Sequence, residues 1–206
     1  MVTIGLVVIT CLISMQAFSN PSMKAKLLHR PVEEHRDREY YRLLTHGFIH
    51  ADYMHLGINM YVLWVFGRFL ETVFVSTLGE MKGRIAFLVM YITTIIAASL
   101  YTHFKHKNNY SYAALGASGA TSGIVFAFVL FNPWEWFIIP PAPAIIAAVL
   151  YLWYSSWASK NSRDNIGHDA HYWGAIYGLV FTILLNPKYL EYFFEQLQYP
   201  KPPPFF

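Results

Sequence analysis

The sequence predicts an all-α membrane protein with six transmembrane helices. The observations behind this are a low charge, a high apolar and aromatic content, and six apolar segments. Only 13% of the 206 residues are Asp, Glu, Lys or Arg, whereas 55% are hydrophobic and 18% are aromatic. A soluble domain usually carries about 25% charged residues. The composition excludes a disordered chain, a nucleic-acid-binding protein and an ordinary cytosolic enzyme, and it makes the lipid bilayer the expected partner.

A helix that crosses the bilayer core needs about 20 mostly apolar residues. The segments that approach this length are 2–19, 53–75, 85–102, 115–131, 137–159 and 170–185. The first segment has no Lys or Arg before its apolar run, so we expect a retained helix rather than a cleaved signal peptide. Three prolines, Pro140, Pro141 and Pro143, should distort or delay the start of the fifth helix. Without a repeat or linker, residues 1–206 are expected to form a single domain.

A long polar connection, residues 20–45, joins the first two predicted spans and holds six basic and four acidic residues. Such long connections are uncommon and often functional. Counting Lys and Arg in alternate loops gives ten on the side of this loop and five on the other side. By the positive-inside rule alone, the loop would be cytoplasmic.

Polar side chains inside the predicted spans are costly in lipid and are therefore candidates for function. His55 and Asn59 are four residues apart, so a helix places both on one face, where both can donate hydrogen bonds towards a common point. His50 lies just before them in the same polar run.

Two pairs of glycines, Gly119 with Gly123 and Gly174 with Gly178, form small faces on the fourth and sixth spans. Such faces allow helices to approach backbone to backbone. Ser118 precedes the first face, and His171 lies one turn before the second. Close packing would bring a serine hydroxyl near an imidazole, which is what nucleophilic catalysis by serine requires. Since no acidic third member is well placed, we expect a Ser118–His171 dyad.

Other interpretations of these residues remain open. The glycine pairs alone are common packing devices, and Ser118 alone can bond back to its own helix. Ser122, one turn beyond Ser118, can compete as the nucleophile. Several histidines are candidate ligands of a metal or haem; these are His46, His50, His55, His168 and His171. Their spacing is irregular and no carboxylate supports them, so we expect no metal site.

Taken in order, these features resemble the rhomboid family of intramembrane serine proteases. The resemblance covers residues 41–178, about two-thirds of the chain. Its motifs are Tyr41-Arg42-Leu43-Leu44-Thr45, His50, His55-x-x-x-Asn59, Gly67-Arg68-Phe69-Leu70-Glu71, Gly116-Ala117-Ser118-Gly119 and His171-x-x-Gly174-x-x-x-Gly178.

The resemblance implies a six-helix rhomboid-like bundle with a long, partly membrane-embedded first loop. It makes Ser118 the nucleophile and His171 the general base. The oxyanion and substrate-binding set would comprise the Ser118 amide with His55, Asn59, Gly116 and His50. Arg42 and Glu71 would support the first loop. The implied substrates are transmembrane proteins, reached through a polar cavity that is open to one membrane face, and no cofactor is implied.

Three features depart from the family pattern. Tyr41 stands where family members often have Trp. Ser122 stands four residues after the nucleophile, where an aromatic residue commonly packs on the catalytic His; this leaves the orientation of His171 unexplained. The charge count also opposes the family topology, in which the amino terminus is cytoplasmic. We favour the family topology, in the cell (inner) membrane with the active site opening to the outer face.

The alternative is a non-proteolytic rhomboid-like protein that binds membrane clients. Loss of the dyad would identify such a protein, and both dyad residues are present here.

Overall fold

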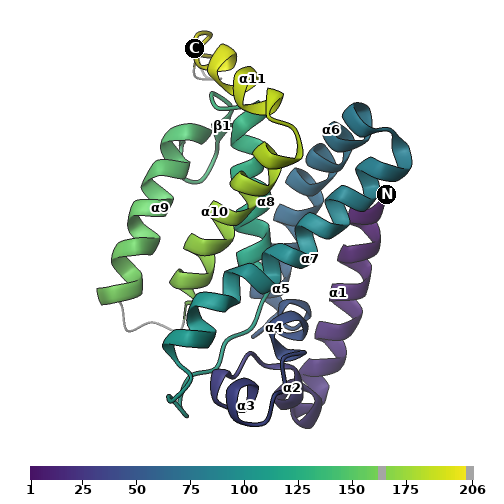
Figure 1. The fold of residues 1–206 in the computed structure, drawn as a ribbon, viewed down its shortest axis with the longest axis vertical. Coiled ribbons are helices and arrows are strands. Elements are labelled where there is room, and N and C mark those ends of the chain that lie inside the picture. Colours follow the sequence, from purple (N-terminus) through teal and green to yellow (C-terminus); the bar gives the residue numbers. More distant parts are fainter. Residues whose placement is uncertain (162–165, 203–206) are drawn as a thin grey trace.

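The long helices of the computed structural model lie side by side along its long axis (Figure 1). The structure describes residues 1–161 and 166–202; the predicted domain also includes residues 162–165, with Arg163 of the charge count, and 203–206, which lie outside this range. The helices of the bundle are α1 (Val2–Ser19), α5 (Tyr53–Val62), α6 (Arg68–Leu78), α7 (Glu80–Lys105), α8 (Ser118–Phe131), α9 (Ala144–Asn161) and α10 (His168–Leu185). A π-helical segment, η2 (Leu63–Gly67), joins α5 and α6 into one continuous helix.

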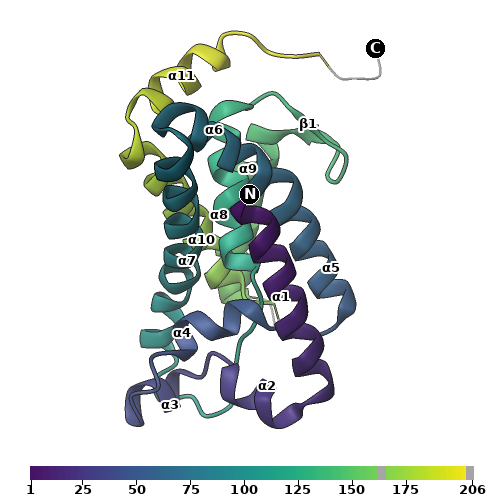
Figure 2. The same cartoon turned by 90° about the vertical axis from the view of Figure 1, so that its right-hand side faces the viewer.

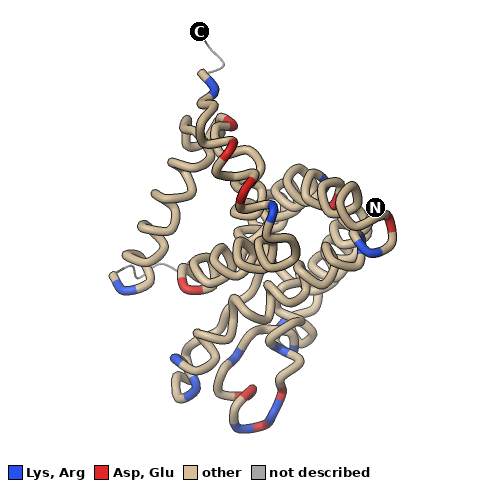
Figure 3. The backbone as a smooth tube through the Cα atoms, turned by 45° about the horizontal axis from the view of Figure 1, so that its top comes forward, with Lys and Arg blue, Asp and Glu red and all other residues tan. Residues whose placement is uncertain are grey.

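Three of these helical segments have the length and hydropathy of membrane spans: Val2–Ser19, Tyr53–Leu78 and Glu80–Lys105. They correspond to the first three predicted spans. Helix α8 is a shorter apolar helix, and α9 and α10 each have 18 residues. The charged residues are concentrated in loops and towards helix ends (Figure 3), as expected for a chain whose helices lie in lipid.

The fifth helix starts later than residue 137, where its apolar run begins. Residues 136–143 form a small antiparallel hairpin in which β1 (Trp136–Phe137) pairs with β2 (Ala142–Pro143). Helix α9 therefore begins at Ala144. The cause is the proline-rich stretch, because proline lacks the amide that a helix interior needs and its ring clashes with the preceding turn.

Helix α8 is the centre of the bundle, and nearly every residue in it is buried. It packs against α7, α10 and the short carboxy-terminal helix α11 (Lys188–Leu197). Tyr189 of α11 lies edge-on against Phe131, with ring centroids 4.9 Å apart. A helix that is apolar on all sides belongs in the interior, so this element is surrounded by the other helices.

The first loop folds into short helices at the end of the bundle opposite α11 (Figure 2). These are α2 (Pro21–Leu27), α3 (Pro31–Arg36), α4 (Arg42–Thr45) and the 3₁₀ helix η1 (His46–Phe48). The buried Arg42 donates through Nη1 to the carbonyl oxygens of Ala25 (2.9 Å) and Leu28 (3.1 Å), and through Nε to Glu39 (2.6 Å). Arg42 thus ties the carboxy-terminal end of α2 to α4.

Glu71 does not lie in this loop. Its carboxylate accepts hydrogen bonds from the amides of Val2 (2.8 Å) and Thr3 (2.9 Å) and from the Thr3 hydroxyl (2.7 Å). The first amides of a helix have no partner within the helix and carry partial positive charge, so a carboxylate is favourable there. Glu71 stabilises the first turn of α1, not the first loop as the sequence suggested.

A buried cluster around Glu34 fastens the first loop to α7. Glu34 accepts from His29 Nδ1 (2.6 Å) and from His103 Nδ1 on α7 (2.7 Å). His29 Nε2 lies 2.9 Å from the hydroxyl of Thr102, which donates its own proton to the Ser99 carbonyl oxygen. Burial disfavours the Glu34 carboxylate, but the bonds and charges of His29 and His103 outweigh it, so the pKa of Glu34 lies below its usual range.

Glu34→Gln should lower the free energy of unfolding by about 3 kcal/mol, because it removes the buried carboxylate that accepts hydrogen bonds from both His29 Nδ1 and His103 Nδ1. A carboxyl with a lowered pKa contributes its full stabilisation above its ordinary value of about 4.3, and loses it as pH falls through the lower value of the folded state. In thermal unfolding in detergent, the stability of the wild type should therefore decrease as the pH falls below about 4.5. The stability of the variant should decrease less over the same pH range, because it lacks this carboxyl group.

Glu33→Gln is the matched control, because Glu33 pairs with Arg30 at the partly exposed surface. Its effect should stay below about 1 kcal/mol. Equal stability of Glu34→Gln and wild type at pH 7 would contradict the role given to the buried cluster.

Candidate active site

A cavity of about 1330 Å³ lies among α5, α8, α9, α10 and the β1–β2 hairpin. Its wall includes the proposed dyad and the candidate oxyanion residues, which are Ser118, His171, His55, Asn59 and Gly116. Much of the remaining wall is apolar, with Ile58 and Val62 from α5 facing Ala147 and Leu150 from α9. The cavity therefore joins a small polar region to a wider apolar one.

Ser118 is the first residue of α8, directly after a turn that only glycine suits. Gly116 has φ +116°, a conformation that side chains rarely adopt. A Cβ there would also lie 2.7 Å from Cε1 and 2.9 Å from Nε2 of His55. Gly116 thus allows both the sharp entry into α8 and the close approach of the His55 ring to the residues before Ser118.

His50 is fully buried and contacts this turn through a hydrogen bond. Its Nε2 accepts the amide proton of Ala117 (3.3 Å), so its proton is on Nδ1. Nδ1 donates to the Ser14 hydroxyl (2.9 Å), which donates to the Phe48 carbonyl oxygen (2.9 Å). The ring also meets His55 edge-on, with centroids 5.0 Å apart. In this structure His50 connects α1, the first loop and the turn before Ser118.

Asn59 has a fixed orientation on the cavity wall. Its Oδ1 accepts from the Thr121 hydroxyl of α8 (3.1 Å), and its Nδ2 donates to the His55 carbonyl oxygen (2.9 Å). His55 Nδ1 accepts a long bond from the Ala51 amide (3.5 Å), which leaves the ring proton on Nε2. His55 and Asn59 thus present N–H donors from adjacent turns of α5.

The glycine faces bring α8 and α10 into backbone contact. A Cβ on Gly174 would lie 2.1 Å from the Gly119 carbonyl oxygen, and one on Gly178 would lie 2.4 Å from Gly123 Cα. Real Cβ atoms never approach backbone so closely. This interface sets the spacing of the two helices, and Ser118 and His171 both border the cavity beside it.

Ser122 of α8 contacts a residue of α9 that the sequence did not indicate. Its hydroxyl donates to the Ser118 carbonyl oxygen (2.7 Å) and lies 2.7 Å from the hydroxyl of Tyr151 on α9. The Tyr151 ring is stacked on the His171 ring, with centroids 6.1 Å apart and planes inclined by 24°. The sequence around an aromatic residue in an apolar helix does not indicate which residue it packs against, so this contact is known only from the fold.

The other two candidate histidines each lie beside another imidazole: the ring of His46 lies 5.3 Å from that of His29, and the ring of His168 meets that of His171 edge-on at 6.2 Å. His46 lies 2.7 Å from the Ser99 hydroxyl, and His168 meets Tyr154 edge-on at 5.5 Å. Within residues 1–161 and 166–202, no group of three or more His, Cys, Asp or Glu side chains is arranged to hold a metal ion.

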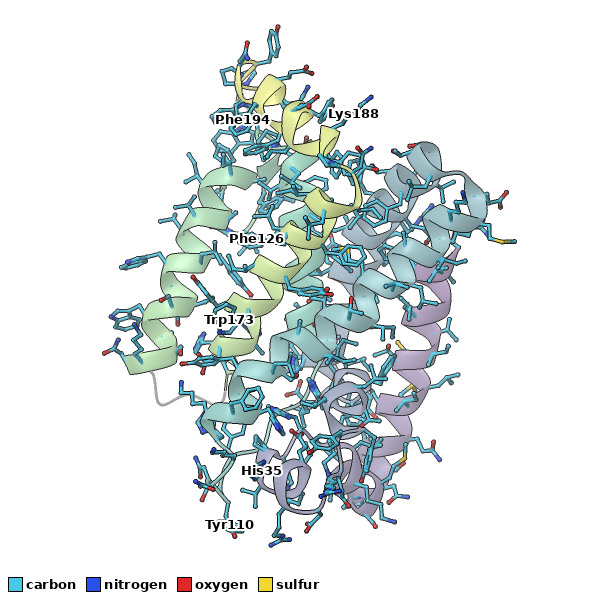
Figure 4. All side chains as sticks on the ribbon, in the orientation of Figure 1. His35, Tyr110, Phe126, Trp173, Lys188 and Phe194 are labelled. Carbon is cyan, nitrogen blue, oxygen red and sulfur yellow. The ribbon has the colours of Figure 1, made fainter. Side chains whose placement is uncertain are left out.

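Figure 4 shows how the site lies relative to the two ends of the molecule. His35 and Tyr110 lie at the end with the first loop, and Lys188 and Phe194 lie at the end with α11. Ser118 is the first residue of α8, and His171 lies in the first turn of α10. Both candidate residues therefore lie towards the first-loop end of the bundle.

Comparisons with known proteins identify the family of this chain. The model of the rhomboid domain matches residues 37–188. The chain is 27% identical over 170 residues to Rhomboid-like protein 11, chloroplastic, of Arabidopsis thaliana, covering 74% of this chain and 55% of that protein. It is 27% identical over 146 residues to Rhomboid protein 1, mitochondrial, of Saccharomyces cerevisiae, covering 68% and 40%. It is 22% identical over 158 residues to Rhomboid protease GlpG of Haemophilus influenzae, covering 77% and 76%.

The chain spans about half the length of the chloroplast and mitochondrial relatives. The rhomboid model, by contrast, matches most of this chain, including every residue of the candidate site. The chain therefore belongs to the rhomboid family.

Proposed function

We propose that this integral membrane protein is an intramembrane serine protease. It hydrolyses peptide bonds in or near the transmembrane segments of membrane-anchored proteins through a Ser118–His171 dyad. The observation that carries the proposal is the shared cavity, whose wall combines a hydroxyl, an imidazole and N–H donors. Membership of a family that includes proteins named as proteases supports it.

In the first half of the reaction, His171 removes the hydroxyl proton of Ser118 as Oγ attacks the carbonyl carbon of the scissile bond. The carbonyl oxygen becomes an oxyanion, which accepts hydrogen bonds from His55 Nε2, Asn59 Nδ2 and the Ser118 amide. One Nδ2 proton bonds to the His55 carbonyl oxygen, and the second serves the oxyanion. The Ser118 amide is free for this role because the first amides of a helix have no helical partner.

Collapse of the tetrahedral intermediate expels the amine, which takes the proton held by His171. In the second half, His171 activates a water molecule, which hydrolyses the acyl ester and regenerates Ser118. Oxyanion stabilisation is often the largest catalytic contribution, typically about 3–4 kcal/mol for one donor. His50 and Gly116 act by holding the turn that carries the Ser118 amide, and Arg42 by bracing the first loop.

The wall of the cavity supports this substrate class. Its apolar surface between α5 and α9 suits an apolar helix, and its polar region suits a peptide bond that has left the helical conformation. The six-span topology, the cell (inner) membrane and an outward-facing active site belong to the proposal. Protease protection of an epitope placed in the loop after α7, within residues 106–112, tests the orientation in sealed inverted and right-side-out vesicles.

Purified protein in liposomes should cleave a model transmembrane substrate, and Ser118→Ala should reduce cleavage to background. A fluorophosphonate probe, which reacts with activated serines, should label the wild type and not this variant. Ser76→Ala is the matched control, because Ser76 is exposed on α6 and its hydroxyl bonds only to the Val73 carbonyl oxygen of its own helix. Labelling retained in Ser118→Ala would overturn the role of Ser118. A folded wild type that is neither labelled nor active would favour the client-binding alternative.

A further inference from the structure

Tyr151 of α9 contacts His171 directly and is linked to Ser118 through Ser122. Its ring lies nearly parallel to the His171 ring, with centroids 6.1 Å apart and planes inclined by 24°. Offset stacking at 4.5–7 Å is a favourable arrangement of aromatic rings, worth about 0.5–1.5 kcal/mol beyond simple burial. The stacked ring restricts rotation of the imidazole about its side-chain bonds.

The hydroxyl of Tyr151 reaches Ser118 through Ser122. The Ser122 hydroxyl has one proton, which it donates to the Ser118 carbonyl oxygen (2.7 Å). It must therefore accept the proton of the Tyr151 hydroxyl, 2.7 Å away. A directed chain of hydrogen bonds thus runs from the phenol of α9 to the backbone of the candidate nucleophile.

The small side chain at position 122 makes this contact possible. Residue 122 lies about one helical turn after Ser118, on the same side of α8. A large ring at this position would occupy the space into which Tyr151 extends. A serine instead leaves room for the tyrosine and offers a hydroxyl to hold it. Phe126, one turn further along α8, also packs against the Tyr151 ring, with centroids 5.9 Å apart.

We propose that Tyr151 is a positioning residue for the dyad: its ring orients His171, and its hydroxyl, acting through Ser122, fixes the first turn of α8 that carries Ser118. This inference rests on the proposed protease function. It also resolves the departure at Ser122, because the aromatic partner of His171 comes from α9 instead of α8. Correct alignment of base and nucleophile matters because a misplacement of about 1 Å can cost roughly 100-fold in rate.

The proposal is tested by kinetics of substrate cleavage in liposomes. Tyr151→Leu should lower kcat about 100-fold with little change in KM, because the apolar volume remains but the stacked ring is lost. Tyr151→Phe keeps the ring and loses one hydrogen bond, so it should recover most of this loss and stay within about tenfold of wild type. Ser122→Ala should match Tyr151→Phe, since it breaks the same chain. Trp153→Leu is the matched control on α9, because Trp153 is 67% exposed.

A swapped variant provides an independent check. Ser122→Phe combined with Tyr151→Ala restores a ring from α8 in the space vacated on α9. This pair should recover activity relative to Tyr151→Ala alone. Wild-type kcat in Tyr151→Leu, or an effect on KM alone, would overturn the positioning role.

Proton NMR of histidine-labelled protein separates this inference from the proposed function. The His171 ring signals, assigned through their loss in His171→Gln, should shift in Tyr151→Leu and remain near the wild-type positions in Tyr151→Phe. That result would support the stacking even if the wild type cleaved no substrate. Unchanged signals in Tyr151→Leu would overturn the inference whether or not the protein is a protease.

Discussion

Replacing Gly174 with alanine should cost at least about 3 kcal/mol of stability and abolish cleavage. The added Cβ would lie 2.1 Å from the carbonyl oxygen of Gly119 and 2.7 Å from its carbonyl carbon. Both are backbone atoms of a buried helix, so no side chain can rotate away and the two helices must separate. Overpacking of cores usually costs 1–3 kcal/mol, and a backbone-to-backbone clash lies at or beyond the upper end of that range.

Thermal unfolding in detergent measures this effect, and cleavage of a model substrate reports whether Ser118 and His171 remain together. Gly5→Ala is the matched control, because Gly5 also lies in a helix but has open space where a Cβ would point. The control should unfold at the wild-type temperature or at a slightly higher one, since alanine favours the helical conformation over glycine. A Gly174→Ala protein with wild-type stability and activity would show that the α8–α10 contact is not as tight as the structure has it.

Removing His171 should lower the cleavage rate by several orders of magnitude, and so should removing Ser118. The double variant should be no worse than either single variant, because base and nucleophile act as one unit. His171→Ala should still express and unfold near the wild-type temperature. His171 borders a cavity, so its removal enlarges an existing cavity and creates no new void in a packed core.

The test compares the cleavage rates of the two single variants with the rate of the double variant. Additive losses, with the double variant far worse than each single one, would indicate that the two residues act in separate steps. Appreciable turnover by His171→Ala would refute the dyad. The fluorophosphonate probe gives the same comparison for the first chemical step alone.

The sequence was sufficient for those parts of the fold that follow from local spacing. Apolar length predicted the helices, and the first three of them have the hydropathy of membrane spans. A separation of four residues put His55 and Asn59 on one face of α5, where both border the cavity. The glycine pairs predicted a close helix contact, and Cβ atoms built on Gly174 and Gly178 overlap the backbone of α8.

Contacts between distant segments escaped prediction. Nothing near Glu71 indicates that its carboxylate binds amides almost 70 positions earlier, at the start of α1. His50 looked like a donor beside His55, yet its ring faces Ser14 and Ala117, which come from two other segments. Tyr151 lies among apolar residues of α9 without a motif around it. In each case the contacting residue is determined by how the helices pack in three dimensions. The spacing of residues within one helix does not contain this information.

The contact between α8 and α10 has a consequence for biosynthesis. Helix α8 is nearly all buried and α10 supplies one of its main neighbours, yet α10 is made only after α9. The nascent chain therefore carries Ser118 before it carries His171, and during this interval the serine has no base. For the protease proposed above, the dyad is thus incomplete during insertion into the membrane. We expect catalysis only after α10 has packed against α8.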